Sequence, residues 1–529
     1  MQSVSSAWTS ETKDTVRKIA ENLLVSWKKE TNLSQTTFTI GVSTIGGNDI
    51  IGITPGAVGG PGIYKYFDES EYIANLAWER SLNMPIGGLS MAMAEATLDN
   101  TNKRFTPRFM GGNSELFTAV LTRRPALISA GFNFNGIDQT IPQFSGIFTR
   151  QPRVDTRGAE ISLQMADYID FFSNRFLDRT AVFTSVSTDT IMETMLQTEL
   201  GMSTSQFDLD PGISVIPFAM FNRGEKFSKI FQELASAENG QFYQNEEGIF
   251  KFENRQHWDS SPYTEVQRVI STGQVINALE PSVDHVINVV EIKASVRSKA
   301  ITQAIWSQSI PTLVPANSTV EIFADFLDDN GSLPVLEVFV PTYSANPSIT
   351  SFFSTNTQED GSGATNSGAI SLKSYYQFTT AYKMVFENNS SQNTYLTQLE
   401  LWGRPAKVTS KVYTKRQRDS SVTAYEEQPL TIENDFIQSQ DWADSFAEQI
   451  LEDFANPENL QEITIAAIPE LQLGDLISWQ GRYWRVYSIK SKLDPSTGFI
   501  QDLKLLQRTI RSYFRVGIST IGGSDQIAP

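Results

Sequence analysis

Short apolar runs separated by turn residues make up much of the sequence, and they limit what this chain can fold into. Between residues 63 and 150, strand-like runs such as 89–98 and 116–121 alternate with turn clusters. Short runs of this kind, bounded by Gly, Pro, Asn or Asp, are typical of β-barrels and β-sandwiches. Charged residues are only 19% of the chain and aromatic residues 11%, which suits β-rich surfaces. We therefore predict a mainly β protein.

Helical periodicity interrupts the strands and adds α+β parts. In four segments, apolar residues recur at the spacing of one helical face. The first of these segments places four apolar residues on such a face, namely Val16, Ile19, Ala20 and Leu23. A short strand at 24–27 is expected to follow it. The predicted helices are 11–23, 190–200, 226–237 and 441–454, and a predicted strand–turn–strand unit at 240–252 follows the third.

The segment 301–407 differs from its surroundings in its pattern of strand-like runs and loop residues. It combines several strand-like runs with a loop at 355–368 that is rich in Gly, Ser, Asn and Thr. This pattern favours an inserted β-sandwich. Aromatic side chains exposed on the insert would stack on sugars of a host surface glycan, whereas aromatic side chains in its core would only fill space. The aromatic residues in question are Trp306, Tyr375, Tyr376 and Tyr382.

One internal repeat links the two ends of the chain. The sequence IGVSTIGGND at 40–49 returns almost unchanged as VGISTIGGSD at 516–525. A β-branched strand followed by a Gly-Gly turn offers unpaired backbone groups for pairing with another chain, so we predict two arms that grip equivalent partners. Two unrelated hairpins that arose by duplication remain the alternative. The candidate arm residues are Ile45, Gly46, Gly47, Asp49, Ile521, Gly522, Gly523 and Asp525.

The sequence contains few of the cysteine and histidine residues that commonly catalyse reactions or bind metal ions. The chain has no cysteine and two histidines, and neither His257 nor His285 is accompanied by a Gly-x-Ser-x-Gly turn. The acidic run that begins at Asp328 superficially resembles a calcium loop, but Phe326 occupies the first ligand position and Asn330-Gly331 favours a hairpin turn. We therefore expect no catalytic residue, no cofactor and no metal site.

The charge balance argues against static nucleic-acid binding. The formal net charge is -18 and the sequence pI is about 4.7, whereas neutralising phosphates requires clustered Lys and Arg. The first eight residues lack the pattern of a secretion signal, and no run of apolar residues is long enough to span a membrane.

Several strings, taken in order, give the sequence a resemblance to the hub proteins at the distal end of bacteriophage tails, the family that includes baseplate hubs and the N-terminal part of tail-associated lysins. The resemblance extends over most of the chain. No single string is specific for this family, but the order of the strings along the chain is. The strings are 96–107, which we expect to be a strand ending in an Asx turn, then 144–148, 161–167, the helices at 190–200 and 226–237, 288–292, 443–454 and 468–477.

The resemblance implies two tail-tube-like β-barrels in each subunit and a trimer that continues the tail tube. The chain then divides into six parts. These are an N-terminal helix and arm at 1–62, a first barrel at 63–188, a small α+β domain at 189–261, a second barrel at 262–300 plus 408–505 that includes the helix 441–454, the inserted β-sandwich at 301–407, and a C-terminal arm at 506–529.

The resemblance also implies a structural virion protein and not an enzyme. Such a hub closes or continues the tail tube, anchors fibres or receptor-binding proteins, and forms the passage for DNA. Its expected partners are further copies of itself, the tail tube, distal tail and tape measure proteins, and DNA that passes without specific binding. It is expected at the tail tip or baseplate of the virion, after synthesis in the host cytoplasm.

Two alternatives stay open at this stage. A hexameric distal tail ring or adhesin carrier would have six copies with one barrel each. A tail-borne cell-wall or glycan hydrolase is disfavoured because such a protein normally carries an appended catalytic domain, and too few residues follow 505 to form one.

Overall fold

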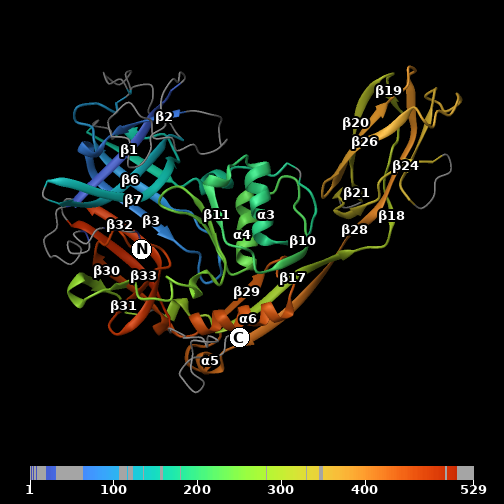
Figure 1. Ribbon diagram of the computed structural model, residues 1–529. Helices are drawn as coiled ribbons and strands as arrows, with labels where there is room; N and C mark the ends of the chain where they lie inside the picture. The colour runs from blue at the N-terminus through green and yellow to red at the C-terminus, as the bar shows by residue number, and fades with distance from the viewer. Residues whose placement is uncertain are drawn as a thin grey trace, which may run out of the picture.

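The structure is a computed structural model that describes residues 2, 4, 8, 19–30, 63–106, 116, 123–134, 136–154, 159–178, 180–280, 283–328, 331–344, 350–494 and 497–508. It is mainly β, as the sequence predicts, with several sheets and a few helices (Figure 1). Within these ranges no helix has both the length and the apolar character needed to cross a membrane.

The largest element is a 14-stranded sheet that contains strands from both halves of the chain. Its path runs β16-β30-β33-β32-β3-β5-β9-β7-β6-β1-β2, and β8, β15 and β31 pair beside that path. The early strands are β1 (Ile19–Glu30), β2 (Ile63–Asp68), β3 (Ile73–Ser81), β5 (Met93–Asp99), β6 (Pro125–Phe134), β7 (Ile137–Phe148), β8 (Arg153–Val154) and β9 (Glu160–Ala166). The late strands are β15 (Arg268–Val269), β16 (Val275–Ala278), β30 (Leu460–Ala466), β31 (Leu476–Trp479), β32 (Arg482–Asp494) and β33 (Gly498–Gln507).

The early and late strands join at one seam, where β3 and β32 pair antiparallel. The register runs from Leu76 opposite Leu493 to Ser81 opposite Ser488. Core packing also crosses the seam, because Leu493 and Phe499 lie in the hydrophobic cluster of the early strands. The two β units are therefore fused edge to edge. In the part of the chain that the structure describes, no strand pairing closes either unit into a barrel, and the barrels stay a prediction.

The predicted N-terminal helix is wrong over residues 19–23, where the structure has the start of β1. This strand pairs with β6 from Ile19 opposite Phe132 to Val25 opposite Ala126. Residues 23–27 are all buried, so both faces of this part of the strand are covered. The match to helical spacing was too short to predict the element, since the pairing with β6 decides the conformation here. Residues 9–18 lie outside the described ranges.

The three other predicted helices are confirmed, and so is the strand–turn–strand unit. They correspond to α3 (Thr188–Thr194), which continues as a π-helical turn at Met195–Glu199, to α4 (Phe227–Ala237) and to α6 (Gln440–Phe454). The unit at 240–252 is formed by β13 (Gln241–Gln244) and β14 (Phe250–Glu253), which belong to a sheet with β4 (Gly88–Leu89) and β11 (Phe207–Leu209). Three further elements lie near α3 and α4 in the sequence, namely α2 (Ile169–Ser173), β10 (Phe183–Ser187) and β12 (Val215–Ala219). The short helix α5 (Asp419–Tyr425) follows β28.

A long two-stranded ribbon links this body to a separate β unit. Strands β17 (Val289–Lys299) and β28 (Thr394–Gln417) pair antiparallel, and β29 (Pro429–Glu433) pairs parallel beside β17. The N-terminal half of β28 continues into the β unit, which stands away from the large sheet (Figure 1). There it pairs with β18 (Gln303–Ser307), β19 (Thr312–Val314), β23 (Val335–Val338) and β25 (Phe352–Asn356), while β24 (Thr342–Tyr343) pairs with β25.

A second sheet packs against the first in this unit. It contains β20 (Ser318–Asp325), β27 (Ala381–Asn388) and β26 (Ile370–Gln377). Phe353 of the first sheet and Phe386 of the second lie in one hydrophobic cluster, with ring centroids 5.2 Å apart. A hairpin of β21 (Leu327–Asp328) and β22 (Gly331–Ser332) projects beside them. The domain boundaries predicted from the sequence remain predictions.

The early β unit contains a buried carboxylate that three N–H groups hold in place. Glu69 is fully buried, and Trp27 Nε1 donates to its Oε1 at 2.8 Å. Arg104 donates from Nε and Nη2 to the two carboxylate oxygens at 2.8 and 2.9 Å. Arg104 follows the turn after β5, in which Asp99 Oδ1 accepts from Thr101 N at 2.8 Å, so the predicted Asx turn is confirmed.

Replacing Glu69 with glutamine should lower the free energy of unfolding by about 3 kcal/mol, since removing one partner of a buried ion pair leaves the other without its counter-charge. Urea denaturation followed by circular dichroism measures the change. The control is Glu95→Gln, because Glu95 is exposed on β5 and its loss should leave stability nearly unchanged. Equal stabilities of Glu69→Gln and the unmodified chain would contradict this prediction.

Candidate functional site

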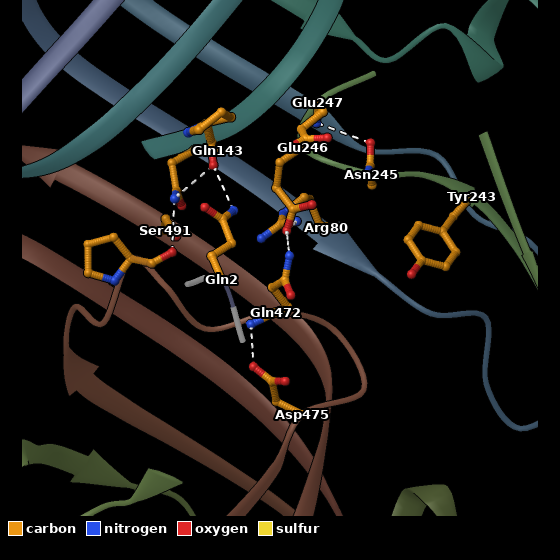
Figure 2. A network of polar contacts seen from close by, with 12 residues as sticks. Gln2, Arg80, Gln143, Tyr243, Asn245, Glu246, Glu247, Gln472, Asp475 and Ser491 are labelled. Atoms are coloured by element: carbon orange, nitrogen blue, oxygen red, sulfur yellow. Dashed lines mark hydrogen bonds and ion pairs between the residues drawn. The ribbon is translucent and has the colours of Figure 1, made fainter. Parts of the chain in front are cut away.

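The parts of the body meet at a buried polar region that we call the polar junction. It consists of Arg80 on β3, Gln143 on β7, Glu246 in the turn between β13 and β14, and the loop 467–475 that precedes β31 (Figure 2). These segments are far apart in the sequence and belong to the early strands, the α+β part and the late strands. The polar junction is therefore the place where their relative arrangement is set.

An ion pair between Arg80 and Glu246 occupies the centre of the polar junction. Arg80 Nη1 contacts Glu246 Oε1, and each side chain is only 4% exposed. Gln472 Nε2 donates to the same carboxylate oxygen at 3.3 Å. Burial raises the pKa of Glu246, but the charge of Arg80 and the hydrogen bonds outweigh burial and leave this pKa below its usual value. Glu246 is therefore ionised, and its charge is neutralised inside the protein.

The second half of the loop 467–475 is a tight turn against β32. Gly474 N donates to Val486 O at 2.7 Å, and Asp475 Oδ2 accepts from Gln472 N at 2.7 Å. Gly474 has a φ of +82°, and a Cβ there would lie 1.6 Å from the ring of Trp258. Only glycine fits this position, and the turn agrees with the residue types of the sequence, because Gly and Asp both favour turns. Asp475 is fully buried, and burial raises its pKa.

The first half of the same loop reaches three other segments. Glu470 is fully buried and accepts from Trp8 Nε1 at 2.8 Å. Arg268 of β15 lies 3.6 Å from the other carboxylate oxygen of Glu470. Gln143 Nε2 donates to Pro469 O at 2.9 Å. The string 468–477, one of those that carry the family resemblance, thus connects both β units and Trp8.

The contacts of the polar junction link segments of the protein to one another. The polar junction contains ion pairs and amide hydrogen bonds, and its charged groups are held by partners inside the protein. Nowhere in the described residues do three or more His, Cys, Asp or Glu side chains gather in a way that would hold a metal ion. These contacts join segments of the early strands, the α+β part and the late strands.

Next to the polar junction, His257 is held by two carboxylates. Its Nδ1 lies 2.7 Å from Asp210 Oδ2, and its Nε2 lies 3.3 Å from Glu253 Oε1. Burial raises the pKa of Glu253 to about 7. Burial lowers the pKa of His257, but the two carboxylates outweigh it and the pKa is raised. Both ring nitrogens face acids, which is the structural role expected for this residue. His285 is exposed, in a short turn at Val283–His285.

The candidate arm residues lie outside the described ranges, so the structure does not place Ile45, Gly46, Gly47, Asp49, Ile521, Gly522, Gly523 or Asp525. The arms therefore stay a prediction.

The acidic run considered as a calcium loop forms a hairpin. Leu327 and Asp328 pair with Ser332 and Gly331, and Gly331 has a φ of +117°. The preferred hairpin interpretation is therefore confirmed.

The aromatic residues of the insert divide into core and surface. Tyr382 is 1% exposed and belongs to the core, whereas Tyr375 and Tyr376 on β26 are 53% and 49% exposed. Trp306 is partly buried against the same core. Tyr375 and Tyr376 are the two of these four that a sugar ring could reach, and glycan binding by the insert stays a prediction.

Sequence reasoning missed most of the polar junction. Glu246 falls in the turn of the predicted strand–turn–strand unit at 240–252, and Arg80 was not singled out. The one available signal was an arginine within the apolar strand 73–81, where a charge requires a partner if it is buried.

Comparisons with known proteins find similarity in structure only. The sequence matches no family model and no curated protein. The structure is similar to the 43 kDa tail protein of prophage MuSo2 from Shewanella oneidensis, with a TM-score of 0.43, 10% identity, and 92% of this chain and 98% of that chain covered. A tail protein from Neisseria meningitidis gives a TM-score of 0.41 and 10% identity over 85% and 95% of the two chains.

A component of the type VI secretion system of E. coli, described as structurally similar to the T4 bacteriophage tail proteins gp27 and gp5, gives a TM-score of 0.37 and 8% identity. The similarity covers 83% of this chain and 74% of the E. coli protein. The chain thus matches phage tail proteins in structure over most of its length.

A double-mutant cycle should show that Arg80 and Glu246 stabilise the fold as a pair. Arg80→Met and Glu246→Leu should each lower the free energy of unfolding by about 3 kcal/mol, because each leaves one buried charge unpaired. The double variant should recover most of the loss of either single variant. Urea unfolding of the four proteins gives the coupling energy.

The control cycle uses Arg223→Met and Asp178→Leu, an ion pair at 2.9 Å whose side chains are 64% and 75% exposed. Its coupling energy should be near zero, as for most exposed pairs. Additive losses at Arg80 and Glu246 would show that the two side chains do not act as a pair.

Proposed function

We propose that this chain is a hub subunit at the distal end of a phage-like tail, located in the tail tip or baseplate of the virion. In this role it continues the tail tube, carries fibres or receptor-binding proteins, and surrounds the passage for DNA. The observation that carries the proposal is the fused sheet, in which an early and a late β unit of one chain join edge to edge at β3 and β32. Three such chains would present six β units to a sixfold tube.

The polar junction supports this role. A subunit that continues a tube must hold its two β units at a fixed angle, because an error at the joint would misalign the ring. The ion pair of Arg80 and Glu246 and the buried Glu470 connect segments of both units. Arg80 Nε and Glu470 Oε1 have no hydrogen-bond partner in the described residues, so the support comes from the pairing of buried charges. These charges are paired in only one arrangement, and they select it over others that have similar apolar burial.

The insert at 301–407 has the form expected of an attachment platform. It has a hydrophobic core of its own and is carried on the ribbon of β17 and β28, away from the large sheet (Figure 1). At its base, Thr379 N donates to Thr180 O at 3.1 Å and so connects it to the body. A fibre or receptor-binding protein could dock on such a unit without disturbing the tube.

The acidic character of the chain fits a passage for DNA. With a net charge of -18, the assembly repels phosphate, and a repelled polymer slides past a wall instead of binding to it. We infer that acidic side chains line the lumen.

The mass and symmetry of the assembled protein test the proposal. Native mass spectrometry should give three times the mass of the 59.0 kDa chain, and electron cryomicroscopy should show a ring of six β units. Six copies that contribute one β unit each would instead support the hexameric distal ring. A lumen lined by Lys and Arg would contradict the proposed route for DNA.

The two repeated arms are proposed to grip equivalent partners in the assembled tail. Replacing Gly46 and Gly47 with valine should impair incorporation into tails as much as replacing Gly522 and Gly523 does, because valine disfavours the glycine turn. Quantitative mass spectrometry of purified particles measures incorporation. The control is Gly273→Val, since open space surrounds that position. Unchanged incorporation of either arm variant would contradict equivalent roles.

A further inference from the structure

A cavity of about 250 Å³ lies between three parts of the body. One wall is the surface of the late sheet around Arg485, on the opposite side of β32 from the core residues Trp484 and Val486. The second wall is the segment after β14, with Trp258 and Tyr263. The third is the C-terminal half of α6 with Asp453. The cavity is separate from the polar junction, and neither continuation of the tube nor passage of DNA requires it.

Arg485 is the unusual residue of this cavity. Its side chain is 7% exposed, and its Nη2 donates to Trp258 O at 3.1 Å. In the described part of the chain, Nε and Nη1 of Arg485 have no acceptor. Burying a guanidinium whose N–H groups lack acceptors is unfavourable, because the hydrogen bonds with water are lost and not replaced. An acceptor that enters the cavity would remove this penalty.

The other two arginines of the cavity already have partners. Arg508 forms an ion pair with Asp453. Arg255 lies over the ring of Trp442, with its Cζ 3.7 Å from the ring centroid, and its Nη1 donates to Ser214 Oγ at 3.4 Å. Burial, aided by the charge of Arg508, lowers the pKa of Arg485 to about 9, so Arg485 is still a cation at neutral pH. Among the three arginines of this cavity, Arg485 is the one with buried N–H groups that lack an acceptor in the described residues.

We propose that this cavity is a binding site for a single carboxylate, held by the guanidinium of Arg485. Its volume suits an acidic side chain or a small organic acid, and the rings of Trp258 and Tyr263 form an apolar wall for the attached methylene groups. Asp259 and Glu452 also line it, which disfavours a doubly charged anion such as phosphate. The carboxylate can come from an Asp or Glu side chain of a partner protein or from a free small acid.

Titration of the full-length protein, followed by its thermal unfolding at constant ionic strength, tests this proposal. The probes are sodium acetate, N-acetylglutamate, a short neutral peptide that contains one Glu, and the same peptide with Gln. The expected result is a saturable rise in Tm with the carboxylates and no rise with the Gln peptide or with inorganic phosphate. At least tenfold tighter binding of the Glu peptide identifies a protein side chain as the ligand, and equal binding of the free acids identifies a small molecule.

Three variants connect the response to the cavity. Arg485→Met should weaken carboxylate binding at least tenfold, and Thr264→Phe, which fills the cavity from its wall, should do the same without removing a charge. The matched control is Arg223→Met, because Arg223 is exposed and does not line the cavity, and this variant should bind like the unmodified protein. The proposal fails if no probe with a carboxylate gives a saturable response, if phosphate binds more tightly, or if Arg485→Met and Thr264→Phe both bind as the unmodified protein does.

Discussion

The edge-to-edge pairing of β3 with β32 is the interaction on which the rest of this structure depends. It converts two β units from opposite ends of the chain into one 14-stranded sheet. The α+β part and the ribbon of β17 and β28 are then placed relative to that sheet. Backbone hydrogen bonds hold the two edges together but specify the register only weakly, because neighbouring registers offer similar bonds. Side chains around the seam must supply the specificity.

The polar junction supplies it. Arg80 is on β3 itself, and its partner Glu246 comes from the β13–β14 turn, while Gln472 joins them from the loop before β31. A slip of the seam by one residue would move Arg80 to the opposite face and leave Glu246 buried without a counter-charge, at a penalty of several kcal/mol. Buried charge therefore favours one register here, and the same register sets the orientation of the two β units relative to each other.

Elements with strong local periodicity could be predicted from the sequence. The helices α3, α4 and α6 bury a continuous apolar face, and Leu327–Asp328 pairs with Gly331–Ser332 as expected of strands on either side of a hairpin turn. The error at 19–23 shows the limit, because Ile19, Ala20 and Leu23 match a helical face and yet lie in β1, which pairs with β6. The cavity around Arg485 could not be predicted from the sequence, since the sequence does not show which side chains cover the outer face of β32.

The sequence by itself determined the mainly β composition, three of the helices, the Asx turn at Asp99, the turn at Gly474 and the shortage of residues for metal or nucleophilic chemistry. These properties depend on neighbours in the chain, whose spacing is fixed by covalent geometry. Only the tertiary structure decided that the two β units share one sheet and that Arg80 meets Glu246. Local periodicity shows which face of an element is buried, but the partner of that face depends on long-range pairing that spacing along the chain does not record.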